Sequence, residues 1–307
     1  MRDFDSFLRE EGVSSELLDE ASQFRLQHEV GKYDFRRIPD PPYLYYGKEV
    51  WEKAIAALLC GENLLLAGPK ATGKNVLAEN LACLFGRPLW NVSFHVNVDA
   101  SYLIGSDTYD GSKVVFRPGP VYCCAERGGF GVLDEINMAR NEALAVLHAA
   151  LDFRRVIDVA GYDKIEMDPA ARFIATMNYG YAGTRDLNEA LCSRFAILEM
   201  PLIAPDDLDR LLKDTFPDMK EQMRRQFTQL FYELERKAKS AEVSERSLDL
   251  RGLLDAAALI HKGVCSGDAL EMCIVNKTFD AYERGLVMDV IRARIPMDLT
   301  RADVFGT

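Results

Sequence analysis

The chain has 307 residues, 48% hydrophobic and 28% charged, which is typical of a globular protein with a large core domain and a smaller second one. It contains no apolar run of transmembrane length and its first 30 residues are acidic and polar, so neither a membrane span nor a secretory signal is predicted and a cytoplasmic protein is expected. A net charge of −11 disfavours nucleic-acid binding, and seven scattered cysteines without a C-x-x-C pair predict buried, reduced thiols rather than a disulfide framework or zinc site.

The first 44 residues predict an N-terminal helical extension and linker. Residues 3–11 and 15–29 have the pattern of two short amphipathic helices, the second capped by Ser14 or Ser15. Residues 37–46 are proline-rich and predict an extended linker. A helix over residues 46–59 then leads into the first strand. We expect the extension to pack on the core or on a neighbouring subunit.

The segment near residue 70 carries the clearest functional signal. Leu64–Leu66 predicts a buried strand, the G-x-x-x-x-G-K spacing runs from Gly68 to Lys74, and apolar residues at helical spacing follow. A glycine loop between a strand and a helix can turn its N–H groups onto phosphate oxygens, whereas the alternative is a glycine-rich turn without a ligand. The predicted nucleotide-binding residues are Gly68, Pro69, Lys70, Ala71, Thr72, Gly73, Lys74, Asn75 and Val76.

Asn75 departs from this pattern, because the residue after the lysine is normally Ser or Thr, whose hydroxyl binds magnesium. An amide oxygen is also a hard ligand that magnesium accepts. We therefore expect Asn75 to be a metal ligand, and the departure to affect the rate of hydrolysis more than nucleotide binding.

Two later strands end in polar side chains. The strand within residues 128–135 ends in Asp134 and Glu135, which suits a magnesium ligand followed by a general base for the attacking water. The strand over residues 172–178 ends in Asn178, which can bond the outer phosphate or the water. The alternatives are a solvated Glu135 and a turn-forming Asn178.

These motifs, in this order, resemble the AAA+ ATPases, and within them the MoxR branch and its AAA_5-type relatives, over about residues 45–265. Residues 101–124 are similar to the family's insert in its second helix, and residues 154–169 to its inserted hairpin. Residues 141–151 are expected to form one helix, with Leu144, Leu147, Ala150 and Leu151 inward. The segment 183–195 resembles the one that carries the arginine finger, a role the resemblance gives to Arg194, before a fourth strand, with Arg185 as a weaker candidate. The alternative for Arg194 is a surface charge.

After residue 201 the composition changes to charged stretches with helical apolar spacing, over residues 206–238, 247–263 and 268–292. This suits the helical lid of AAA+ proteins. The family carries a phosphate-sensing arginine at a helix start here, which the resemblance gives to Arg246, with Arg251 as the second candidate. The alternative is an arginine on the helix surface.

The predicted fold is an α/β P-loop NTPase (AAA+) core with a parallel sheet over residues 45–203, followed by an all-helical lid over residues 204–307. The resemblance implies ATP and Mg²⁺ as cofactors, hydrolysis at the interfaces of a homo-hexameric ring, and chaperone-like remodelling of a client protein. It also implies a von Willebrand factor A domain partner and a role in metalloenzyme maturation. Two alternatives stay open: a nucleotide-dependent switch or scaffold with negligible turnover, and a DNA-acting motor.

Overall fold

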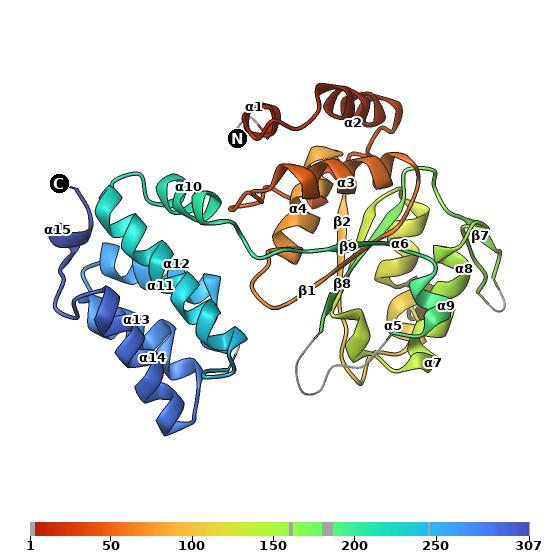
Figure 1. Ribbon diagram of the computed structural model, residues 1–307. Helices are drawn as coiled ribbons and strands as arrows, with labels where there is room; N and C mark the ends of the chain where they lie inside the picture. Colours follow the sequence, from red (N-terminus) through yellow and green to blue (C-terminus); the bar gives the residue numbers. More distant parts are fainter. Residues whose placement is uncertain (1–3, 160–161, 180–186, 245, 307) are drawn as a thin grey trace. The chain divides into compact units, whose positions relative to one another are not determined.

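The computed structural model describes residues 4–159, 162–179, 187–244 and 246–306 (Figure 1). The chain forms two compact units. The first holds Met1–Pro69 and Gly73–Pro201, and the second holds Leu202–Thr307 together with Lys70–Thr72. No helix in the described part of the chain is long and apolar enough to cross a membrane.

The first unit is built on a five-stranded parallel sheet with the strand order β2-β5-β8-β1-β9. The strands are β1 (Leu64–Gly68), β2 (Leu89–Ser93), β5 (Phe130–Asp134), β8 (Arg172–Asn178) and β9 (Ala196–Glu199). β1 is buried along its whole length, as expected for a parallel strand covered on both faces. The predicted parallel α/β core is therefore confirmed, and β2 is a strand that the sequence analysis did not assign.

The sheet is contacted by helices α3 (Lys48–Leu59), α4 (Lys74–Leu84) and α6 (Pro120–Glu126). The segment predicted as one helix over residues 141–151 is instead broken into α7 (Asn141–Leu144), the 3₁₀ turn η3 (Ala145–Leu147) and α8 (His148–Leu151). The four residues predicted to point inward are all buried. The chain is wound more tightly at the break, because a 3₁₀ turn is tighter than an α-helical one. The same apolar side chains still face the core.

Two hairpins leave the sheet. A short helix, α5 (Ala100–Ile104), leads into β3 (Gly105–Tyr109) and β4 (Val114–Pro118), which pair antiparallel within the predicted insert. Gly105 has a φ of +131°, and a Cβ there would lie 2.4 Å from the Arg117 carbonyl oxygen, so only glycine fits. The second hairpin, β6 (Val156–Ile157) with β7 (Ile165–Glu166), lies within the predicted residues 154–169.

The N-terminal segment belongs to the same compact unit as the sheet. It contains α1 (Phe4–Glu10), α2 (Ser15–Gln27) and the 3₁₀ turn η1 (Phe35–Arg37). The Phe24 ring of α2 packs edge-on against Phe85, with ring centroids 5.2 Å apart. Ser14 is the N-cap of α2, but its side chain makes no capping bond; its backbone N–H donates to Glu52 Oε1 at 3.0 Å. The predicted serine cap is thus wrong in mechanism, because a tertiary hydrogen bond anchors this turn.

The cysteines correct a further prediction. All seven are free, but Cys60 is exposed and Cys124 is the one that is fully buried, so the expectation of buried thiols is wrong for most of them. Cys124 packs in the core beneath the sheet, and burial raises its pKa well above the ordinary thiol value.

The second unit is helical in its described part, apart from a single bridge between Met219 and Phe305. The stretch predicted over residues 268–292 is divided at Ile274–Asp280, where the chain turns through a 3₁₀ segment. The helices are α10 (Pro205–Thr215), α11 (Glu221–Lys239), α12 (Leu250–His261), α13 (Ser266–Cys273), α14 (Ala281–Arg294) and α15 (Arg301–Val304), with η4 (Val275–Lys277) between α13 and α14.

Candidate nucleotide-binding site

The candidate site lies at the edge of the sheet where the strands β1, β8 and β5 end. Gly68 at the end of β1 pairs with Asn178 at the end of β8, and Leu133, one residue before Asp134, pairs with Ala175. Because all three strands are parallel, their carboxyl ends meet at one edge. The predicted loop, Asp134 and Asn178 are thereby brought together.

The loop after β1 has the backbone geometry of an anion cradle. Ala71 and Gly73 both lie in the left-handed region, with φ of 63° and 76°. Residues of alternating hand turn successive N–H groups toward one concave side, which is how backbone nests hold phosphate. Gly73 is the N-cap of α4, so the N-terminus of the helix, its positive dipole end, lies at the same place.

Two close approaches fix this loop. A Cβ on Gly68 would lie 2.8 Å from the Met200 carbonyl oxygen, so that position requires glycine. The Tyr45 ring packs against Gly73, and the Tyr45 N–H donates to Asn80 Oδ1 of α4 at 2.9 Å. The sequence analysis gave Tyr45 no role. Its aromatic character at the first residue of the predicted core was the available signal.

Lys74 is buried, with 7% of its surface exposed. Its Nζ donates to the carbonyl oxygens of Gly68 at 3.0 Å and Pro69 at 2.6 Å. Burial lowers the pKa of Lys74 to about 8, while the charges of Asp134 and Glu135 act in the opposite direction. A desolvated ammonium gains more from a negative group in direct contact than one in water does, which suits Lys74 to a phosphate contact.

The ends of β5 and β8 are joined by a hydrogen-bond chain. Thr176 Oγ1 donates to Asp134 Oδ1 at 2.6 Å and accepts the N–H of Glu135 at 3.0 Å. Asn178 Nδ2 donates to Glu135 Oε1 at 3.1 Å, and Asn137 Nδ2 donates to the Asn178 carbonyl oxygen at 3.0 Å. Glu135 itself has a left-handed backbone, with a φ of 54°, which turns the chain directly after the strand. These bonds orient both carboxylates.

Thr176 is a site residue that the sequence analysis missed. It is buried, with 1% of its surface exposed, and lies two residues before Asn178 on the same face of β8. A polar residue at that alternate position of a buried strand was the signal that could have identified it.

The family model of the AAA_5 domain, the dynein-related subfamily of AAA domains, matches residues 63–195. This chain belongs to that family. An uncharacterized Bacillus subtilis protein, YojN, is 34% identical over 77% of this chain and 79% of its own length. An uncharacterized Staphylococcus epidermidis protein is 31% identical over 79% of this chain and 94% of its own length. The solved structure of a RuvB mutant from Thermotoga maritima matches 80% of this chain and 69% of that one, with 18% identity and a TM-score of 0.46.

An AAA domain implies nucleotide binding, typically with Mg²⁺, and the residues of this AAA domain fit that pair. Among the described residues, no group of three or more His, Cys, Asp or Glu side chains could hold a metal by itself. Magnesium at nucleotide sites uses one or two protein oxygens together with phosphate oxygens. Asp134 at the end of β5 and Asn75, exposed on the first turn of α4, carry oxygens of that kind.

Arg194 lies at the opposite edge of the sheet from the loop. It precedes β9, whose first residue Ala196 pairs with Leu64 at the start of β1, whereas Gly68 ends that strand. Four residues of strand separate the two edges by roughly 13 Å. Arg194 is therefore remote from the phosphate loop of its own chain. Arg185, the weaker candidate, lies outside the described residues.

In the second unit, Arg246 is exposed and lies four residues before α12. The helix begins at Leu250, where the N-cap Asp249 accepts the Arg251 N–H at 3.0 Å. The expectation that Arg246 opens the helix is wrong, because the Asp249 cap sets the start and leaves Arg251 on the first turn. Which arginine senses phosphate stays a prediction.

Proposed function

We propose that this chain is a MoxR-like ATPase that binds and hydrolyses ATP with Mg²⁺ at interfaces between copies of itself, assembled as a homo-hexameric ring. The observation that carries the proposal is the convergence of Lys74, Asp134, Glu135 and Asn178 at one edge of the sheet, where Thr176 joins the two acidic residues and Asn178 bonds Glu135. A cation, a metal-binding carboxylate, a base and a fixed amide are the parts that phosphoryl transfer to water requires.

Each residue has a distinct role in this proposal. Lys74, now bonded to the Gly68 and Pro69 carbonyls, would contact the outer phosphates, and Asp134 and Asn75 would hold Mg²⁺, which would supply charge neutralisation on the transferred group. Glu135 orients the attacking water and takes its proton. Asn178, which donates to Glu135 Oε1 at 3.1 Å, keeps that carboxylate aimed.

Arg194 completes the site of a neighbouring copy rather than its own. Its position about 13 Å along the sheet from Gly68 supports this assignment. An arginine supplied in trans can contribute about 10³–10⁵ in rate by neutralising charge on the transferring phosphoryl group. ATP-driven movement of the core against the lid, with Arg246 or Arg251 sensing phosphate, would then act on a client protein. A von Willebrand factor A domain partner and metalloenzyme maturation are proposed by family resemblance.

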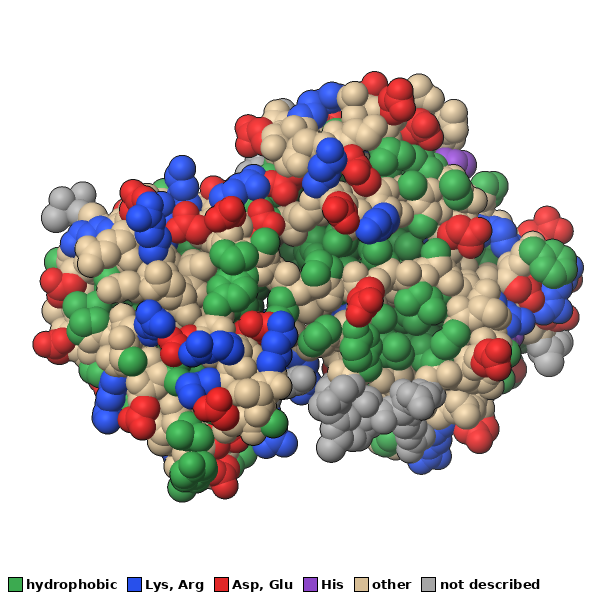
Figure 2. Space-filling view, in the orientation of Figure 1, with side chains coloured by type: hydrophobic (Ala, Val, Ile, Leu, Met, Phe, Trp, Pro, Cys, Tyr) green, Lys and Arg blue, Asp and Glu red, His purple; other side chains and the backbone are tan. Residues whose placement is uncertain are grey.

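Two other functions are kept as alternatives. The exposed Asn75 in place of a hydroxyl residue favours a nucleotide-dependent switch or scaffold with negligible turnover. A DNA-acting motor has less support, because the net charge is −11 and, over the described residues on the face in Figure 2, acidic and basic side chains are interspersed without a continuous basic stripe.

Replacing the base tests the chemistry. Glu135→Gln should bind ATP with unchanged affinity and release phosphate at least a hundredfold more slowly, the lower part of the range for general acid–base catalysis. Glu142→Gln, an exposed carboxyl on α7, is the matched control and should keep the wild-type rate. Wild-type turnover by Glu135→Gln would remove the base assignment, whereas tight ATP binding without turnover in the wild type would favour the switch. DNA stimulation of phosphate release would favour the motor.

Mixing two inactive variants tests the shared site. Arg194→Ala should bind ATP but hydrolyse it slowly, and Lys74→Ala should not bind it. In a mixed ring, an Arg194→Ala subunit beside a Lys74→Ala subunit has its own phosphate loop and its neighbour's Arg194, so activity should partly return. No recovery after verified subunit exchange would count against the shared site. The exchange is repeated with wild-type subunits in excess. A loss of activity larger than the fraction of variant subunits would identify a ring whose sites act in concert.

A further inference from the structure

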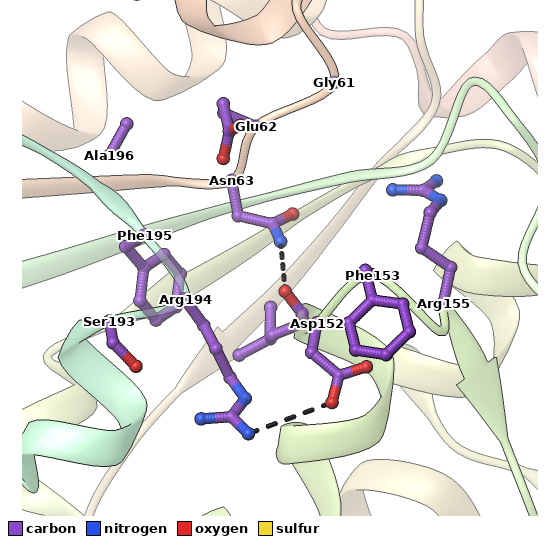
Figure 3. A pocket seen from close by; sticks show the side chains of 11 residues that line it. Gly61, Glu62, Asn63, Asp152, Phe153, Arg155, Ser193, Arg194, Phe195 and Ala196 are labelled. Atoms are coloured by element: carbon purple, nitrogen blue, oxygen red, sulfur yellow. Dashed lines mark hydrogen bonds and ion pairs between the residues drawn. The ribbon is translucent and has the colours of Figure 1, made fainter.

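The edge of the sheet that carries Arg194 is hollowed. A pocket of about 540 Å³ is lined by residues 61–63 before β1, by the end of α8 and the segment after it, and by residues 193–196, the last of which begins β9 (Figure 3). Phe153 on its rim is 92% exposed. Arg194 and Asp152 reach toward each other from two sides of this pocket.

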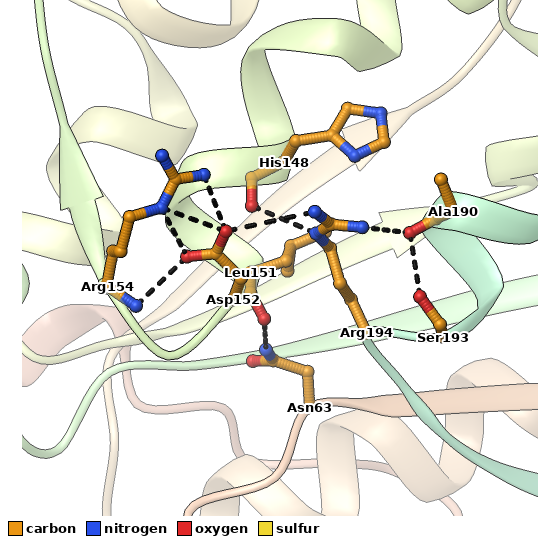
Figure 4. Close-up of polar contacts among 8 residues, drawn as sticks. All are labelled: Asn63, His148, Leu151, Asp152, Arg154, Ala190, Ser193 and Arg194. Atoms are coloured by element: carbon orange, nitrogen blue, oxygen red, sulfur yellow. Dashed lines mark hydrogen bonds and ion pairs between the residues drawn. The ribbon is translucent and has the colours of Figure 1, made fainter.

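The Arg194 side chain is held by three acceptors (Figure 4). Its Nε donates to the His148 carbonyl oxygen at 3.1 Å, and its Nη1 donates to the Ala190 carbonyl oxygen. Its Nη2 forms an ion pair with Asp152 Oδ2 at 3.8 Å. The Arg194 side chain is 23% exposed, so it is oriented but not fully covered.

Asp152 is itself held in place by Arg154, two residues later in the chain. Arg154 Nε donates to both carboxylate oxygens, at 3.1 and 3.0 Å, and Arg154 Nη2 donates to Oδ2 at 2.6 Å. The Arg154 backbone N–H also donates to Oδ1 at 2.9 Å. The Arg154 side-chain bonds are the main cause that lowers the pKa of Asp152, so this carboxylate stays ionised at neutral pH.

Asn63, directly before β1, binds both the segment that carries Asp152 and the segment that carries Arg194. Its Nδ2 donates to the Leu151 carbonyl oxygen at 3.2 Å, directly before Asp152. Its Oδ1 accepts the Phe173 N–H at 2.9 Å, and its backbone oxygen accepts the Ala196 N–H at 2.8 Å, two residues after Arg194. Asn63 is buried, with 5% of its surface exposed. The backbones that carry Asp152 and Arg194 therefore share one anchor.

We propose that Asp152 is the positioning residue of Arg194: its carboxylate holds the guanidinium at this edge, ready for the phosphate bound by a neighbouring copy. The inference rests on the proposed function. At 3.8 Å the pair is longer than a hydrogen bond, so Asp152 attracts the guanidinium through its charge, while the His148 and Ala190 carbonyl oxygens set its direction and Nη2 keeps its donors for a phosphate. A phosphate carries more charge than a carboxylate and can take the guanidinium over, while Arg154 keeps Asp152 paired.

The first experiment measures phosphate release and ATP affinity of Asp152→Asn. Because a partly exposed ion pair contributes little, the expected loss in kcat is about fivefold, the rate equivalent of about 1 kcal/mol, with the ATP dissociation constant unchanged. Asp158→Asn, an exposed carboxyl in the following hairpin, is the control for charge removal and should keep the wild-type rate. A wild-type or higher rate for Asp152→Asn would overturn the proposal.

Two further measurements separate positioning from damage to the fold. In an Arg194→Ala background, Asp152→Asn should cause no additional loss in single-turnover rate, because it acts through Arg194. Mixed with Lys74→Ala, which supplies an intact Asp152 and Arg194 to its neighbour, Asp152→Asn subunits should gain rate. An additional loss, or no gain after verified exchange, would overturn the role. A normal turnover rate for Arg194→Ala would contradict the shared site itself. A slow rate for Arg194→Ala together with a normal rate for Asp152→Asn would contradict only the positioning role of Asp152.

Discussion

The buried charge of Lys74 predicts an unusual dependence of stability on pH. Its pKa falls from 10.5 to about 8 in the folded chain, mainly because burial removes the ammonium from water. Between these two values the unfolded chain binds more protons than the folded one, so the free energy of unfolding contributed by Lys74 rises with pH. Full conversion of that difference gives about 3 kcal/mol, and after discounting for solvent screening we expect about 1–2 kcal/mol.

The assay compares the nucleotide-free wild type with Lys74→Met, which keeps the length of the side chain and removes the titrating group. Urea unfolding at pH 7, 8, 9 and 10 gives the free energy of unfolding of each protein. The difference, wild type minus Lys74→Met, should grow by about 1–2 kcal/mol over this range, since other groups titrate in both proteins. A difference that stays constant, or shrinks with rising pH, would refute the burial of a charged amine in the loop.

Three other predictions concern single contacts. Thr176→Val removes the hydroxyl that accepts the Glu135 N–H, and should lower the free energy of unfolding by about 1–3 kcal/mol in thermal melts and slow phosphate release. Asn75→Thr should lower the magnesium concentration that gives half-maximal activity; an unchanged or raised requirement would mean that Asn75 already coordinates well or lies outside the metal shell. Glu283→Gln weakens the hydrogen bonds that Glu283 accepts from Ser244, Ser247 and Thr278, and should lower the free energy of unfolding. Burial would raise the pKa of Glu283, but these hydrogen bonds outweigh burial and the pKa is lowered. The stability that the bonds give is therefore lost as pH falls, so the destabilisation caused by Glu283→Gln should fade in acid.

The phosphate loop could be identified from the sequence because all of its parts are contiguous. A buried strand, a glycine loop and a helix start lie within about twenty residues, and the backbone geometry follows from local residue types: Gly73 takes the left-handed φ, and the helix begins at Lys74. Three of the other strands, β5, β8 and β9, were predicted for the same reason, since an apolar run is the local pattern of a parallel strand buried on both faces.

Interactions between distant segments depended on the tertiary structure. Thr176 contacts Asp134 across 42 residues because β5 and β8 pair in one register, and a one-residue slip would turn its hydroxyl to the other face. The Asp152 carboxylate meets Arg194 because Asn63 binds both segments, although each carries only an ordinary charged residue in the sequence. Local patterns determined which residues can bind phosphate. Strand order and register decided which of them meet, because those depend on the packing of the whole sheet rather than on any one segment.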